Sequence, residues 1–236
     1  MKIEWVGTPN FRAGRNGLQP LAIVNHITAG GYPGCLSWMQ NPKAQVSAHY
    51  LVLRDGRILQ LVKDENTAWH AGVVNRHNWS LYDGTNPNFY TIGIEHEGMP
   101  GDELTDAQYK STLWLHGQLT AKYPTITVDD QHIIGHYRID SVNRPNCPGP
   151  KFPWVKLFAD LKGETEVDNL VIYADGDTGA ALILSQKLGC PMVHKGSADK
   201  YQAAKKHWVG VQGTNDDGNV YYAGINRTDT AKKVLE

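Results

Sequence analysis

Cysteine is scarce in this chain, and neither sign of charge is in excess. Only three cysteines, Cys35, Cys147 and Cys190, occur among 236 residues, which argues against a disulfide framework and favours free or metal-bound thiols. Lys and Arg number 23 and Asp and Glu 24, so the net charge is −1. We therefore expect that the overall charge of the protein does not attract nucleic acid or an anionic membrane. A local basic groove is the remaining possibility.

Long apolar runs are missing as well. No run approaches the roughly 18 apolar residues that a membrane-spanning helix needs. The first five residues, Met-Lys-Ile-Glu-Trp, carry an acid where a secretory signal peptide has its apolar segment. These absences predict no membrane insertion and a protein that is made in the cytoplasm without an export signal of its own.

The composition that remains is typical of a globular protein, with 41% hydrophobic and 20% charged residues. Eight of the ten histidines lie at or before His136, which sets the first part of the chain apart from the last. Between the two parts, residues 162–168 are polar and charged and predict a short linker. We therefore predict two domains, residues 1–162 and 169–236.

The first domain combines apolar runs of strand length with one long helical segment. Asp55 and Gly56, between two β-rich runs, predict a hairpin turn. Thr105 is a suitable N-cap for a helix over residues 106–122, which must end before Pro124. The fold class is α/β, with helices flanking a mixed central sheet. Its strands are predicted at residues 21–26, 48–53, 58–62, 91–97 and 133–136, and a short helix within residues 33–45.

The second domain shows a different alternation, in which short strands and helices follow one another along the chain. This order is typical of βαβ units and predicts a small α/β domain with a parallel sheet. The predicted strands are residues 169–173, 191–193, 208–211 and 220–223, and the predicted helices are residues 178–188, 200–206 and 228–235.

Two imidazoles and one thiol stand out as candidate metal ligands. His26 follows one apolar strand, His136 ends another, and Cys147 lies in a Pro/Gly-rich loop. Two imidazoles and a thiolate suit a zinc ion that keeps a fourth position for water. The alternative is that both histidines are hydrogen-bonded residues at strand ends and that Cys147 is inert, because ligands spread along the chain have no diagnostic spacing.

Six sequence blocks occur in an order that resembles the zinc-dependent N-acetylmuramoyl-L-alanine amidases of the amidase-2 and peptidoglycan-recognition type. The resemblance covers about residues 20–158. It implies that the mixed sheet carries a zinc site and that the protein hydrolyses the amide bond between N-acetylmuramic acid and L-alanine in the peptidoglycan of the bacterial cell wall. The blocks are VNHITAG (24–30), VSAHYLV (46–52), AWHAG (68–72), IGIEHEG (92–98), GHYRID (135–140) and NCPGP (146–150).

The resemblance assigns roles block by block. It places the zinc ligands at His26, His136 and Cys147 and the catalytic base at Glu95, which would take a proton from water and pass it to the departing nitrogen. His70, preceded by Trp69, falls where the family lines the groove for the muropeptide. The chain departs from some relatives, which place a lysine two positions before the last ligand; Pro145 stands there, and Arg144 precedes it as the candidate for holding the oxyanion.

Several alternatives remain open at this stage. A noncatalytic peptidoglycan-binding protein on the same fold is the rival to the enzyme, and His70 is as readily structural as substrate-binding. His49 is expected to pack rather than to bind metal, and Cys35 and Cys190 to be buried or inert. Trp38, Trp69, Trp79 and Tyr90 are candidates for a sugar-binding groove, although core packing is the commoner fate of aromatic residues.

The second domain carries only a faint resemblance, to a clostridial-type cell-wall-binding repeat, in the segments ADGDTGAA (174–181) and NRTDTA (226–231). A wall-binding module beside a wall hydrolase raises the local substrate concentration by avidity. Together with the missing export signal, this favours a bacteriophage endolysin over a cytoplasmic recycling amidase. Self-association through the second domain is a weaker possibility.

Overall fold

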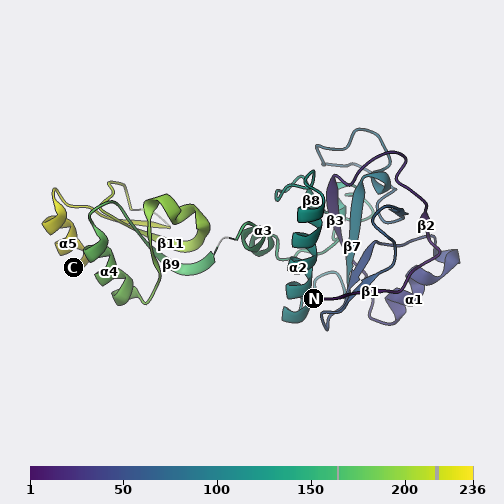
Figure 1. The fold of residues 1–236 in the computed structure, drawn as a ribbon, viewed down its shortest axis with the longest axis horizontal. Helices are drawn as coiled ribbons and strands as arrows, with labels where there is room; N and C mark the ends of the chain where they lie inside the picture. Colours follow the sequence, from purple (N-terminus) through teal and green to yellow (C-terminus); the bar gives the residue numbers. More distant parts are fainter. Residues whose placement is uncertain (164, 216–217, 236) are drawn as a thin grey trace. The chain divides into compact units, whose positions relative to one another are not determined.

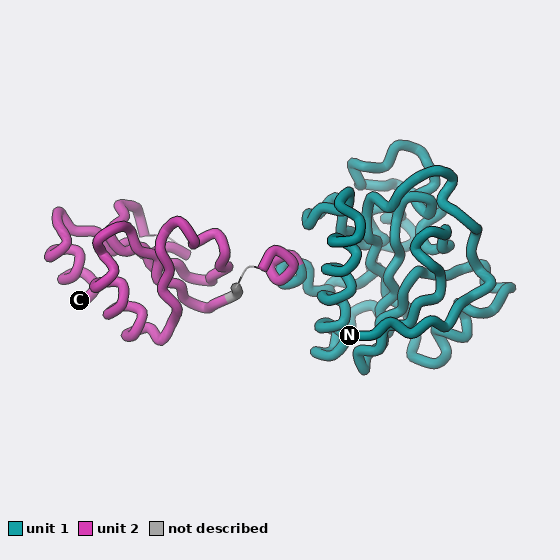
Figure 2. Tube along the Cα trace, viewed as in Figure 1, with its two compact units in different colours: residues 1–157 teal, residues 158–236 magenta. Residues whose placement is uncertain are grey.

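The computed structural model describes residues 1–163, 165–215 and 218–235. The chain forms two compact units, residues 1–157 and 158–236 (Figure 2). The division lies inside helix α3 (Trp154–Lys162), a few residues before the predicted linker. The linker prediction is wrong for residues 165–168, which belong to strand β9 (Thr165–Tyr173), while residue 164 lies outside the described residues.

A six-stranded sheet forms the centre of the larger unit (Figure 1). Every neighbouring pair of strands is parallel except the β4–β5 hairpin, so the predicted mixed sheet is confirmed. The strands lie in the order β1 (Ile3–Trp5), β5 (Ile58–Gln60), β4 (Tyr50–Val52), β7 (Thr91–His96), β3 (Ala22–Ile27) and β8 (Ile133–Gly135).

Helix α2 begins and ends where local signals predict, whereas helix α3 was not predicted. Helix α2 spans Asp106–Lys122, and the Thr105 hydroxyl accepts a hydrogen bond from the Gln108 amide at 3.1 Å, as the cap prediction requires. Helix α1 (Gly34–Gln40) lies within the predicted range. The remaining elements are a small pair of strands, β2 (Phe11–Arg12) and β6 (Thr67–Ala68), and the 3-10 turns η1 (Pro42–Ala44), η2 (Pro87–Phe89) and η3 (His136–Arg138).

The turn between β4 and β5 shows why a glycine is needed there. Gly56 has φ +89°, a conformation that L side chains rarely adopt. A Cβ at this position would also lie 3.0 Å from the backbone oxygen of Ala107 in the first turn of α2. The Asp-Gly pair therefore makes the hairpin and lets the helix approach it.

The pairing of the central strands gathers candidate site residues at one edge of the sheet. β7 and β8 both run parallel to β3, and Glu95 is the register partner of His26. His136 follows the last residue of β8. Because the carboxyl ends of parallel strands meet at one edge, residues far apart in sequence become neighbours there.

The smaller unit holds a four-stranded sheet in which every pairing is parallel, as predicted. A hydrophobic cluster of the smaller unit joins side chains between Val171 and Val234. In sheet order the strands are β10 (Met192–His194), β9, β11 (Tyr201–Val209) and β12 (Asn219–Tyr222), and the helical elements are α4 (Thr178–Leu188), η4 (Lys195–Lys200) and α5 (Arg227–Leu235).

The predicted helix over residues 200–206 is wrong, because this segment is the first part of β11. Its Ala-Ala-Lys-Lys stretch has high helix propensity. In the fold, however, β11 is a central strand that pairs with β9 on one side and with β12 on the other. The mispredicted segment pairs with β9 from Tyr201 onward and with β12 only from Lys206. This pairing, continued by the buried His207 and Val209, overrides the local preference.

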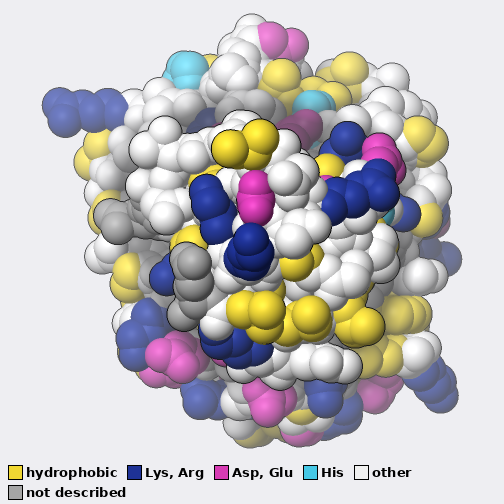
Figure 3. All heavy atoms as spheres, turned by 90° about the vertical axis from the view of Figure 1, so that its left-hand side faces the viewer, with side chains coloured by type: hydrophobic (Ala, Val, Ile, Leu, Met, Phe, Trp, Pro, Cys, Tyr) yellow, Lys and Arg dark blue, Asp and Glu magenta, His cyan; other side chains and the backbone are white. Residues whose placement is uncertain are grey.

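The surface carries charges of both signs. On the face drawn in Figure 3, basic and acidic side chains are interspersed among apolar ones, consistent with a net charge of −1. Among the residues that the structure describes, no helix has both the length and the apolar character needed to cross a membrane.

Candidate active site

The three predicted ligands come together at the edge of the sheet. Nδ1 of His26 lies 3.0 Å from Nδ1 of His136 and 3.9 Å from Sγ of Cys147. The Cys147 sulfur also accepts a hydrogen bond from the Ile27 amide at 3.4 Å. One ligand atom from each of the three residues lies within 4.8 Å of the other two. Parallel pairing of Asn25 with Gly135 makes the two histidines that follow them neighbours.

The chemistry of this cluster fits a zinc ion. All three side chains are at least nine-tenths buried. Burial raises the pKa of Cys147 to about 12 and lowers the pKa of His136 to about 4. A thiolate is therefore unfavourable here unless a cation neutralises it, while the imidazoles are neutral and able to donate lone pairs. Bond lengths of about 2.0–2.1 Å for Zn–N and 2.3 Å for Zn–S are compatible with ligand atoms 3–4 Å apart.

A braced loop positions Cys147. The Tyr137 amide donates to the Cys147 carbonyl at 3.2 Å, and the Cys147 amide donates to the Arg144 carbonyl at 3.2 Å. A Cβ on Gly135 would lie 2.6 Å from the Tyr137 ring and 2.8 Å from Cδ of Pro148. The absence of a side chain at Gly135 thus lets the loop that carries the thiol close over the strand that precedes His136.

Glu95 projects into the same cleft from β7. Its Oε2 atom is buried and has no hydrogen-bond partner. Burial raises the pKa of Glu95 to about 8, and the positive charge of Arg144 opposes this shift. A carboxylate without a partner, beside a site suited to a cation, is able to exchange a proton with a molecule in the cleft.

His70 is hydrogen-bonded to a candidate ligand. Its Nδ1 lies 3.0 Å from Nε2 of His26, and its Nε2 lies 3.2 Å from the hydroxyl of Thr91. Asn88 holds the backbone of this segment, because its Oδ1 accepts from the His70 amide at 3.1 Å and from the Ala71 amide at 2.7 Å. His70 also lines the cleft. It therefore has both a structural contact and a place facing the cleft, and neither of the two roles left open by the sequence is excluded.

The cleft above the ligands has a volume of about 740 Å³. Trp38, 59% exposed, and half-buried Trp69 line it, and exposed Arg144 lies at the same cleft. Trp79 and Tyr90, by contrast, belong to the hydrophobic core, and their rings stack on each other. Two of the four candidate aromatic residues therefore face the cleft.

The remaining candidates behave as packing residues or free thiols. His49 is fully buried, as expected, and its Nδ1 accepts from the Gly93 amide at 3.0 Å. Cys35 and Cys190 are free and partly buried, so of the two expectations, buried or inert, it is the second that stays a prediction for them. Burial raises the pKa of both thiols, and Cys35 lies at the cleft.

Sequence reasoning missed Thr91 and Gly93, which support His70. A Cβ on Gly93 would lie 2.5 Å from Cγ of His70, so the imidazole rests directly against the backbone of β7. A signal for both residues was present, because the period of two along a strand places positions 91, 93 and 95 on one face. The face that carries Glu95 therefore also carries Thr91 and Gly93.

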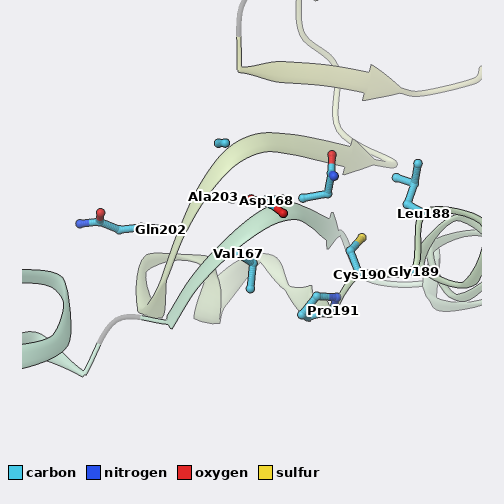
Figure 4. Close-up of a pocket in the computed structure, with 10 residues that line it drawn as sticks. Val167, Asp168, Leu188, Gly189, Cys190, Pro191, Gln202 and Ala203 are labelled. Atoms are coloured by element: carbon cyan, nitrogen blue, oxygen red, sulfur yellow. The ribbon is translucent and has the colours of Figure 1, made fainter. Parts of the chain in front are cut away.

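A second hollow lies in the smaller unit, between β9, β11 and the turn after α4 (Figure 4). Its lining includes Asp168, Asn169, Cys190 and Gln202 among small and apolar residues, and among the described side chains no histidine or glutamate lines it. The cluster suited to a metal and the carboxylate beside it thus belong to the larger unit.

Known proteins resemble the larger unit of this chain. The family described as N-acetylmuramoyl-L-alanine amidase matches residues 16–150, more than half of the chain. N-acetylmuramoyl-L-alanine amidase A of Achromobacter lyticus is 32% identical over 163 residues, which cover 61% of this chain and 85% of that protein. The 1,6-anhydro-N-acetylmuramyl-L-alanine amidase AmpD of Haemophilus influenzae is 41% identical over 119 residues, 50% of this chain and 60% of its own length.

A solved structure shares the fold of the larger unit. The crystal structure of a selenomethionine derivative of AmpD superposes with a TM-score of 0.55 at 30% sequence identity, covering 67% of this chain and 93% of that one. The family match contains all six sequence blocks, including those that carry His26, Glu95, His136 and Cys147. The chain therefore belongs to the N-acetylmuramoyl-L-alanine amidase family.

Proposed function

We propose that the larger unit is a zinc-dependent hydrolase of the amide bond between the lactyl group of N-acetylmuramic acid and L-alanine in peptidoglycan. One observation carries the proposal: His26, His136 and Cys147 cluster in a cleft that Glu95 also lines, and the buried Oε2 atom of Glu95 has no hydrogen-bond partner. The three side chains would hold the metal. When bound, a zinc ion polarises the scissile carbonyl and makes water a better nucleophile at neutral pH.

The residues of this chain supply the proton transfer. Glu95 takes a proton from the attacking water and delivers it to the departing alanine nitrogen. A cation in the ligand cluster favours the charged carboxylate and so opposes the effect of burial, which raises the pKa of Glu95 to about 8. Arg144, exposed at the same cleft, holds the negative charge that develops on the carbonyl oxygen.

The cleft supports a saccharide-peptide substrate. Trp38 and Trp69 offer apolar faces on which a sugar ring packs, and His70 lies below them at the ligands. Both relatives described above are named for cleavage at N-acetylmuramyl-L-alanine. A noncatalytic peptidoglycan-binding protein needs neither the clustered ligands nor the unpartnered carboxylate, so the enzyme is the better supported of the two.

For the cellular role we favour an endolysin, which acts on the wall after release through a permeabilised membrane. The smaller unit has its own parallel sheet and hydrophobic core, and a wall-binding module there would add avidity for an insoluble substrate. Soluble fragments need no such anchor. Self-association through this unit is the alternative role for it.

A recycling amidase that acts on soluble muropeptides is the second candidate. It is favoured by the 41% identity with an enzyme named for 1,6-anhydro-N-acetylmuramyl-L-alanine. The two roles are distinguished by measuring the activity of the full chain and of a chain ending at Gly163, each on purified walls and on soluble muropeptides. The endolysin predicts that truncation lowers activity on walls but not on soluble fragments. If truncation lowers activity neither on walls nor on soluble fragments, and activity on 1,6-anhydro fragments is high, the recycling role is supported.

Metal dependence is tested by stripping and restoring zinc. Removing the metal with a chelator should abolish alanine release, and one equivalent of zinc should restore it. Full activity in a sample verified to be metal-free would contradict the proposed site. Stoichiometric zinc with no release from any wall or muropeptide would favour the noncatalytic binding protein.

A further inference from the structure

His26 contacts a different neighbour with each ring nitrogen. Nδ1 faces His136 at 3.0 Å and Cys147 at 3.9 Å, whereas Nε2 faces Nδ1 of His70 at 3.0 Å. A neutral imidazole carries its single proton on one nitrogen only. A lone pair is therefore directed at the ligand cluster only if the proton of His26 is on Nε2.

The far end of this chain of contacts, at Thr91, determines where the protons lie. The Thr91 hydroxyl donates to the Pro87 carbonyl oxygen at 2.7 Å, and this uses its only proton. The same oxygen lies 3.2 Å from Nε2 of His70 and must act there as the acceptor. Nε2 of His70 therefore carries the proton, and its Nδ1 is left to accept from Nε2 of His26.

We propose that Thr91 and His70 are positioning residues that fix the tautomer of His26, so that its Nδ1 lone pair points at the zinc ion. This inference rests on the zinc site of the proposed function. It also accounts for the contact between Nδ1 of His26 and Nδ1 of His136, which needs one proton when no metal is bound. Since His26 has none on Nδ1, the proton there is supplied by His136.

The packing around His70 leaves it little freedom to adopt another arrangement. Gly93 has no side chain, and the ring lies so close to it that a Cβ would be 2.5 Å from Cγ of His70. Asn88 fixes the backbone of His70 through two hydrogen bonds to its side-chain oxygen. Thr91 is itself fully buried, so water cannot replace its hydroxyl as the partner of the imidazole.

We call the hydrogen-bonded chain from Thr91 through His70 to His26 the relay. Thr91→Val tests the relay because it keeps the shape of the side chain and removes the hydroxyl. Without that acceptor, a proton on Nε2 of His70 keeps only the backbone of Thr91 as a partner. A proton on Nδ1 becomes more favourable, and this places the proton of His26 on the nitrogen that must bind the metal. Zinc affinity, measured by competition with a chromophoric chelator, should fall about 10- to 100-fold, the usual effect of losing such a supporting partner. Thr91→Ser retains the hydroxyl and should restore most of the affinity.

Thr67→Val is the matched control for the loss of a buried threonine hydroxyl. Thr67 is 1% exposed and donates to the Gly14 carbonyl at 2.6 Å, so this variant loses a similar bond to the backbone. It should lower the thermal midpoint while leaving zinc affinity within about twofold of the unmodified protein. Equal losses of zinc affinity in Thr67→Val and Thr91→Val would mean that destabilisation alone explains the effect, and would overturn the proposal.

A second measurement needs neither bound metal nor activity. Long-range proton–nitrogen NMR spectra of the metal-free protein at neutral pH report the tautomer of each histidine. We expect the proton on Nε2 of His70, on Nε2 of His26 and on Nδ1 of His136. A proton on Nδ1 of His70 or of His26 overturns the relay even if zinc binds tightly. If these tautomers are found but no zinc binds, the relay stands and the metal part of the proposed function fails.

Discussion

At Glu95, a single substitution can remove the proposed proton transfer while keeping the shape of the side chain. Its Oε2 atom forms no hydrogen bond, so replacing the acid by the amide removes proton transfer without breaking a contact there. Glu95→Gln should lower turnover by roughly two to four orders of magnitude. Zinc content and wall binding, measured by metal analysis and by pelleting, should be unchanged. Normal turnover would place the base elsewhere, with His70 and Arg144 the next residues to examine.

Cys147 gives the complementary prediction for the metal. Its thiol is the one sulfur in the ligand cluster, and a hydroxyl in its place is a much poorer ligand for a borderline-soft ion such as zinc. Cys147→Ser should therefore weaken zinc binding by at least tenfold, measured by competition with a chelator. The Cys190→Ser variant, in the other unit and outside the cluster, is the control and should bind zinc normally.

At the scale of elements, strand β7 joins the catalytic and the supporting residues, because alternate positions along it face the cleft. Gly93→Ala would bring a methyl group to within 2.5 Å of the His70 ring. The ring has to shift, so we expect weaker zinc binding and a loss of about 1–3 kcal/mol of stability. Zinc competition and urea unfolding measure the two effects.

Gly117→Ala is the control for that substitution. Gly117 lies within helix α2, and a Cβ there meets nothing within 4 Å. Alanine in a helix interior is more favourable than glycine by about 0.5–1 kcal/mol, so this variant should be slightly more stable and bind zinc normally. Loss of zinc binding in Gly117→Ala but not in Gly93→Ala would contradict the role assigned to β7.

Local signals were sufficient to predict several elements and insufficient for others. Thr105 and the Asp-Gly pair at 55–56 act through their own backbone neighbours, so the ends of α2 and the β4–β5 turn were readable from the sequence. The segment 201–206 was not, because its strand conformation comes from pairing with β9. The relay from Thr91 to His26 joins residues 65 positions apart through side chains, and no local pattern encodes such contacts. The ligands were found through motif order, since their spacing alone is not diagnostic.

At the scale of the whole molecule, buried neutral histidines make stability depend on pH. His116 is fully buried, and burial lowers its pKa to about 4, whereas an unfolded histidine has a pKa near 6.5. Between these values the unfolded chain binds the proton and the folded chain does not, so stability falls as the pH drops below about 6.5 and levels off near 4.

His116→Gln should make this pH dependence shallower. The substitution removes one group that binds a proton in the unfolded chain but not in the folded chain. The slope of unfolding free energy against pH should therefore fall by up to about 1.4 kcal/mol per pH unit between pH 6.5 and 4. Urea unfolding at a series of pH values measures the slope. His132→Gln, a variant of a partly exposed histidine, is the comparison, and an equal change in slope for both variants would contradict the assignment to burial.

The two units should fold independently. Among the described residues, hydrophobic clusters of the larger unit join side chains between Val6 and Ile139, and a separate cluster of the smaller unit joins side chains from Val171 onward. A chain ending at Gly163 should therefore unfold cooperatively by itself and bind zinc. The complementary fragment should pellet with walls and release no alanine. If it ignores walls and associates with itself in solution, self-association replaces wall binding as the role of the smaller unit.

The most direct test of the amidase assignment is the identity of the new ends that appear when the zinc-loaded protein digests purified peptidoglycan. Cleavage between N-acetylmuramic acid and L-alanine should release new N-terminal alanine without new reducing sugar, and Glu95→Gln should release neither. New reducing ends without free alanine would show that the bond cleaved is glycosidic, and would contradict the assignment of the cleft and of Glu95.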